Sequence, residues 1–70
     1  MFAEFTSSAI ESINATPEGD KIDVIFAGGR KYTYSTSDIE NFVTMFNEAT
    51  SKGQFINRAL REDMLTQIAV

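Results

Sequence analysis

Hydrophobic and polar residues alternate along the first half of the chain, which is the pattern of half-buried β-strands. The clearest segment is Lys21 to Phe26, one face of which carries Ile22, Val24 and Phe26. We expect two further strands, from Ser8 to Ala15 and from Arg30 to Ser35. The segment Thr16 to Asp20 supplies turn chemistry between the first two strands, because proline fixes φ and Gly19 allows a positive φ.

The Gly28-Gly29 turn decides how the last two strands pair. A two-residue loop would pair Val24 with Thr33, whereas a three-residue loop from Ala27 to Gly29, with Gly29 left-handed, pairs Val24 with Tyr32. We favour the second register because it puts the large apolar groups on one face: Ile22, Val24, Tyr32 and Tyr34. Lys31 and Thr33 then face the other way with Ile25.

The periodicity changes after this segment. Ser37-Asp38-Ile39-Glu40 has the form of a capping box, with Ser37 as the residue that caps a helix start. Apolar residues then recur every three or four positions, as on an amphipathic helix: Ile39, Phe42, Val43, Phe46 and Ala49. We expect Gly53 to end this helix in a left-handed conformation.

A second helix is expected from about Gln54 to Ile68, with an apolar side formed by Phe55, Ile56, Ala59, Leu60 and Met64. The predicted fold class is therefore α+β, in one domain over residues 1–70. Its expected architecture is a small antiparallel three-stranded sheet (β-β-β) followed by two helices packed on one face.

The chain has 70 residues, of which 43% are hydrophobic, and it contains no cysteine and no histidine. A core of this size supplies only about 3–5 kcal/mol of stability, so formation of a homodimer is an open alternative. Without cysteine or histidine there is no motif for a structural metal, and we expect no cofactor. The lack of cysteine, of a signal-peptide pattern and of a long apolar run predicts a cytoplasmic protein that is not in a membrane.

Ten acidic and six basic residues give a net charge of −4. Glu18, Asp20 and Asp23 cluster around the first turn, but they lack the pattern of a calcium loop and fit a solvated hairpin end. With no histidine or cysteine to act as base or nucleophile, we expect that the protein is not an enzyme.

The basic residues fall in two groups, Arg30-Lys31 and the stretch that holds Lys52, Arg58 and Arg61. The ordinary interpretation is a mixed solvated surface, in which Arg58 pairs with Glu62 one helical turn away.

The order of these parts resembles the KTSC domain. The resemblance rests on Phe26 to Tyr34, with its Gly turn and Tyr-x-Tyr, and above all on the Ser-Lys-Gly-x-Phe-x-Asn segment, Ser51 to Asn57. That family is named for an extension of some lysyl-tRNA synthetases, and it also occurs as short stand-alone proteins of bacteria and phages. The synthetase context implies RNA binding.

Two binding functions compete. For RNA, phosphates would contact Arg30, Lys31, Lys52, Arg58 and Arg61 while bases stack on Tyr32 and Tyr34. The expected register disfavours stacking, because it turns both tyrosines towards the helices. We prefer an unknown protein partner, bound at the second helix through Gln54, Phe55, Asn57, Arg58 and Arg61, with an adaptable apolar patch from Met45, Met64 and Phe2 or Phe5.

Overall fold

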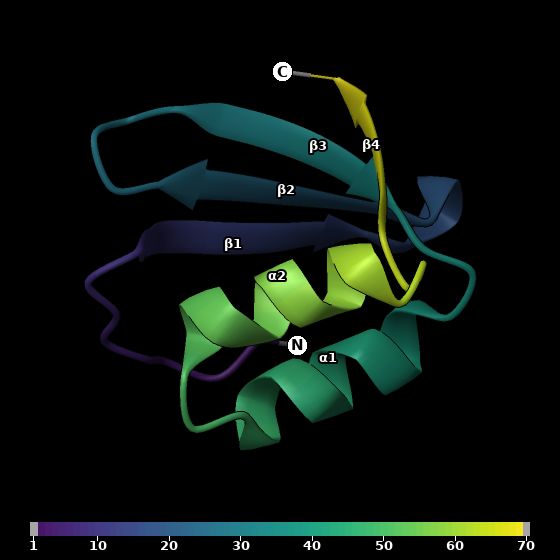
Figure 1. Ribbon diagram of the computed structural model, residues 1–70. Helices are drawn as coiled ribbons and strands as arrows, with labels where there is room; N and C mark the ends of the chain where they lie inside the picture. The colour runs from purple at the N-terminus through teal and green to yellow at the C-terminus, as the bar shows by residue number, and fades with distance from the viewer. Residues whose placement is uncertain (1, 70) are drawn as a thin grey trace.

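The computed structural model describes residues 2–69 and consists of an antiparallel sheet with both helices on one side of it (Figure 1). In chain order the elements are β1 (Ile10–Thr16), the short 3-10 helix η1 (Pro17–Gly19), β2 (Lys21–Phe26), β3 (Lys31–Ser35), α1 (Ile39–Glu48), α2 (Lys52–Arg61) and β4 (Thr66–Ala69). Among these residues, no helix is long and apolar enough to span a bilayer.

The strands lie in the order β1-β2-β3-β4, and the predicted hairpin register is confirmed. Val24 lies opposite Tyr32 and Ile22 opposite Tyr34, because the loop that joins β2 to β3 has three residues. The Phe26 N–H donates to the Arg30 carbonyl over 2.8 Å, which closes this loop. Both of its glycines have positive φ, so the left-handed conformation is not confined to Gly29.

One face of the sheet and both helices enclose the core. The buried hydrophobic residues come from all of these layers: Ile10, Ile13, Ile22, Val24, Tyr34, Ile39, Phe42, Val43, Phe46, Phe55, Ile56, Ala59 and Leu65. The other face of the sheet is polar, and there the Thr33 hydroxyl donates to Asp23 over 2.6 Å. The amphipathic stripe predicted for the first helix is confirmed as its buried side at Ile39, Phe42, Val43 and Phe46, while Ala49 lies just past the end of α1.

The N-terminal segment lies against α1 without forming regular secondary structure. The Phe2 and Phe5 rings each lie 5.3 Å from the Phe46 ring in edge-on contact. The Ala3 N–H also donates to the Asn47 side chain over 3.0 Å. Phe2 and Phe5 therefore complete the core beside α1.

Three local predictions were wrong, each because another residue takes the structural role. Asp38 rather than Ser37 caps α1, and its carboxylate accepts a hydrogen bond from the Asn41 N–H. Gly53 lies inside the first turn of α2 and does not end α1. In the first turn, the left-handed residue is Asp20, with φ of 52°, and not Gly19.

The second helix ends at Arg61, earlier than predicted, and the chain then forms a fourth strand. Asp63 adopts a left-handed conformation, with φ of 59°, and the Met64 N–H donates to the Ala59 carbonyl over 2.8 Å. This is a Schellman ending, in which a left-handed residue stops the helix and its last carbonyls find donors. The released segment pairs with β3, so the sheet has four strands instead of three.

Candidate functional site

Lys52 has a structural role at the end of α1. Its ammonium group donates to the carbonyls of Phe46 (2.8 Å), Asn47 (3.1 Å) and Ala49 (2.8 Å), which end α1. It also lies 5.2 Å from the centre of the Phe46 ring. The Phe46 carbonyl also accepts from the Ala49 N–H over 3.1 Å, and the dipole of α1 favours a cation at this end of the helix. The prediction that Lys52 contacts a partner therefore does not fit its structural role.

Lys31 is separated from the other candidate residues by the sheet itself. It lies opposite Ile25 in the ladder, on the polar face away from the helices. Arg30, Arg58 and Arg61 stay on the helix side, around α2 and the hairpin tip. The structure thus divides the five predicted basic residues among three places, and it forms no continuous basic track from them.

The two tyrosines face the helices, and burial distinguishes them. The Tyr34 side chain is 3% exposed, and burial, with a smaller contribution from Tyr32, raises its pKa above the usual value of 10.0. Tyr32 is half-buried, and its ring lies 6.4 Å from that of Tyr34. Tyr32 is therefore the tyrosine that a partner can contact over a substantial area.

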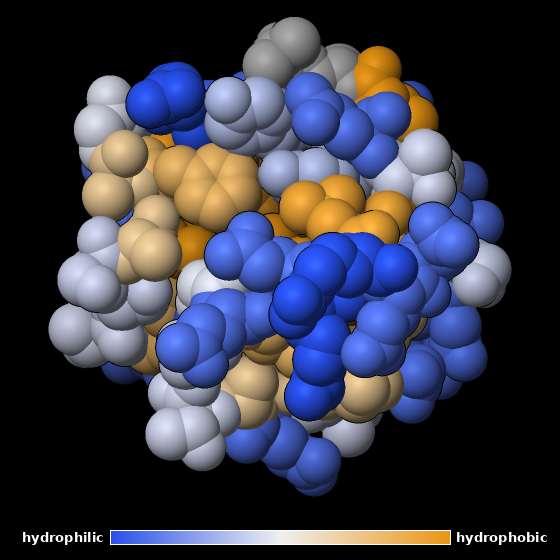
Figure 2. All heavy atoms as spheres, in the orientation of Figure 1, coloured by the Kyte–Doolittle hydropathy of each residue, from blue (hydrophilic) through white to orange (hydrophobic). Residues whose placement is uncertain are grey.

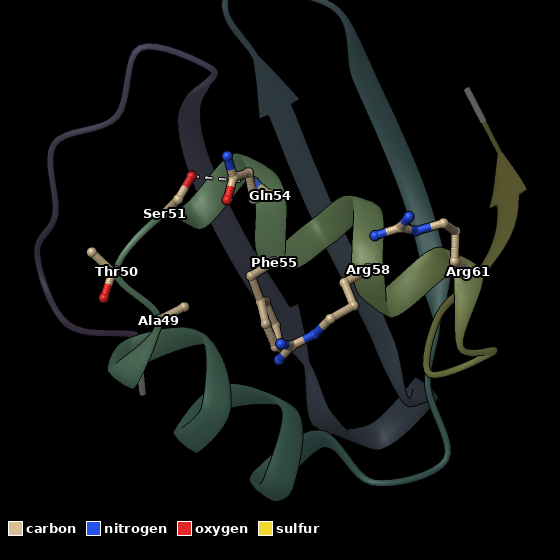
Figure 3. Close-up of a pocket in the computed structure, with 7 residues that line it drawn as sticks. All are labelled: Ala49, Thr50, Ser51, Gln54, Phe55, Arg58 and Arg61. Atoms are coloured by element: carbon tan, nitrogen blue, oxygen red, sulfur yellow. Dashed lines mark hydrogen bonds between the residues drawn. The ribbon is translucent and has the colours of Figure 1, made fainter.

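Phe55 and Arg58 line a hollow of about 310 Å³ between α2 and the end of α1 (Figure 3). Phe55 is 4% exposed, so it is a core residue and offers a partner little surface. The Arg58 guanidinium lies 5.7 Å from the centre of its ring and 4.0 Å from the Glu62 carboxylate. Arg61 also lines this hollow, and its side chain is drawn on the opposite side of the α2 ribbon from Phe55 (Figure 3).

A second hollow, which we call the hairpin groove, lies between the tip of the β2–β3 hairpin, α2 and β4. It has a volume of about 360 Å³ and is lined by Phe26, Ala27, Arg30, Tyr32, Tyr34, Asn57, Leu60 and Gln67. Three of these, Phe26, Tyr32 and Leu60, are half-buried apolar or aromatic side chains. Figure 2 shows this face, with apolar atoms gathered between β3 and α2 and polar atoms around them.

Asn57 lies where three hollows meet. It lines the hairpin groove, a neighbouring hollow with Gln54, Leu60 and Arg61, and a third one beside the N-terminal segment. Its side chain is exposed, and it forms no hydrogen bond within the described residues. The Ser51 hydroxyl, by contrast, caps α2, and Lys52 caps the end of α1.

Four residues of the hairpin groove were not predicted as site residues: Phe26, Ala27, Leu60 and Gln67. Gln67 was expected in a helix, and Leu60 was expected within the core although it is half-buried. The expected apolar patch also differs, because Phe2, Phe5, Met45 and Met64 are half-buried and packed against the core. An alternating Thr66-Gln67-Ile68 segment was the available signal for β4.

The described residues contain no group of three or more side chains suited to hold a metal ion. No family model, no curated protein and no solved structure matches the chain. The resemblance to the KTSC domain therefore stays a prediction that rests on the residues quoted for it.

Proposed function

We propose that this domain is a non-catalytic module that binds a protein partner through the outer face of α2 and the adjoining hairpin groove. The observation that carries the proposal is the position of Asn57, an exposed amide at the meeting point of three hollows. Half-buried apolar side chains with a polar rim are typical of protein interfaces.

The arrangement of charge supports a protein partner over RNA, the alternative implied by the family resemblance. A single-stranded RNA site needs a cationic groove that follows the backbone, together with aromatic rings on which bases stack. Here Lys52 binds helix carbonyls, Lys31 lies on the opposite face and Tyr34 is buried. The net charge of −4 would also oppose a polyanion as long as RNA.

The test is affinity purification with the intact domain as bait, in extract treated with ribonuclease. We expect a protein to be retained, to be lost with Arg61→Glu and to be kept with Lys31→Glu, which makes the same charge change on the other face. Retention that requires RNA, or equal retention by both variants, would show that this surface is not a protein-binding site.

A further inference from the structure

The hairpin groove has the size and lining for one large apolar side chain. Its volume of about 360 Å³ lies within the range of ligand sites, and Phe26, Tyr32 and Leu60 are each half-buried around it. The Phe26 and Tyr32 rings are in edge-on contact at 5.5 Å, which holds both in place before anything binds. A preformed apolar wall lowers the entropic cost of binding a side chain.

The rim of the groove supplies amides for a peptide backbone. Asn57 on α2 and Gln67 on β4 are exposed, and both line the groove. Neither side-chain amide forms a hydrogen bond with another described residue. A side-chain amide both donates and accepts, so it can pair with the N–H and C=O of an extended segment.

The charge around the groove is positive, although the chain is acidic overall. Arg30 lines the groove itself, and Arg61 lines the adjoining hollow, which shares Asn57 and Leu60 with it. Arg30 and Arg61 form no ion pair with any described residue, whereas Arg58 lies near Glu62. None of the described residues that line the hollows around α2 is acidic.

We propose that the hairpin groove binds an extended acidic segment of a partner protein. One large apolar side chain of that segment lies against Phe26, Tyr32 and Leu60, and carboxylates on either side of it contact Arg30 and Arg61. The inference rests on the proposed function and adds the chemistry of the partner. Complementary charge selects the segment, and the apolar side chain fixes its register.

The experiment is selection of a displayed library of random peptides of about 12 residues, which extend to roughly 40 Å. That length exceeds the largest dimension of the domain, 27 Å, and so reaches both arginines from the groove. We expect selected sequences to share a large apolar residue with aspartate or glutamate near it. A synthetic copy of the most enriched peptide, labelled with a fluorophore, then serves as the probe for measuring Kd.

Charge reversal tests the position of the site. Arg30→Glu and Arg61→Glu should each raise the Kd of the probe by about tenfold or more. Raised salt should also weaken binding of the probe. Lys31→Glu is the matched control, because it is adjacent in sequence and exposed but lies on the other face of the sheet. It should change the Kd less than about twofold. Far-ultraviolet circular dichroism checks that all three variants keep the fold.

Other outcomes separate this inference from the proposed function. Selected peptides that bind equally well to Arg30→Glu and Arg61→Glu, or that are basic, overturn the acidic-segment inference but leave a protein-binding domain. A library that yields no enriched peptide overturns the inference as well. Salt-sensitive binding of a mixed RNA oligonucleotide, weakened by the same variants, would overturn both.

Discussion

Replacing Lys52 with methionine removes the cation that joins the end of α1 to the start of α2. The side chain keeps most of its apolar length, but three carbonyl groups lose the ammonium as a donor, and the Phe46 carbonyl keeps the Ala49 N–H. A hydrogen bond that involves a charged group contributes about 1.5–3 kcal/mol. Carbonyls near the surface bind water once the ammonium is removed, which reduces the cost of losing it. The helix dipole (about 0.3–1 kcal/mol) and the contact with the Phe46 ring (about 0.5 kcal/mol) add to this cost. Because rehydration of the carbonyls offsets part of the sum, we expect a loss of about 2–3 kcal/mol.

This loss is large for a domain of this size. About 2–3 kcal/mol is about half or more of the roughly 3–5 kcal/mol that such a core supplies, and it corresponds to a fall in Tm of about 10–20 °C. Urea unfolding and thermal melting followed by circular dichroism measure both quantities. Lys31→Met, an exposed lysine with no partner among the described residues, is the control. If the two variants differ by less than about 0.5 kcal/mol, the capping role assigned to Lys52 is wrong.

Three further changes test other parts of the fold. Gly53→Ala should lower the free energy of unfolding by about 1–3 kcal/mol, despite a gain of about 1 kcal/mol in helix propensity, because the added Cβ would lie 2.8 Å from the Ala9 Cβ. Urea titration should show that adding Ala9→Gly restores most of this loss. A double variant that is no more stable than Gly53→Ala alone would refute the steric explanation. Asp63→Gly should raise Tm by a few degrees, since glycine adopts the left-handed conformation freely and removes an acid from a helix C-terminus. The same replacement at Glu62, where φ is −96°, should not raise it. Finally, Tyr34 remains neutral in the folded state at pH values where it ionises in the unfolded chain, so stability should fall as pH rises above about 10. Urea midpoints across this range should fall less steeply for Tyr34→Phe, and equal slopes would argue against the burial effect.

The hairpin register could be predicted from sequence because only one loop length satisfies the apolar pattern. A shift by one residue would have turned Tyr32 and Tyr34 to the polar face, away from the helices. The amphipathic stripe of α1 was predictable for a similar reason, because every third or fourth position must meet the sheet.

The fourth strand was not predicted from the sequence because the left-handed residue that stops α2 is an aspartate. A glycine at position 63 would have been the usual signal for a helix stop, and without it the apolar pattern continued into Leu65 and Ile68. The candidate site depended on the same error, since Gln67 belongs to the groove only when it lies in β4. The structural role of Lys52 was not predicted for another reason. No pattern in the sequence shows that the first side chain of α2 will donate to the carbonyls at the end of α1.

The position of β4 also bears on the order in which the protein assembles. β1, β2 and β3 follow one another through short connections, whereas both helices stand between β3 and its other neighbour. Pairing of distant segments requires closure of a long loop and is slow compared with hairpin formation. We therefore expect the three-stranded meander to form early and the edge of β3 to stay open until β4 arrives. Since Gln67 forms part of the groove, the binding surface would be the last feature of the molecule to be completed.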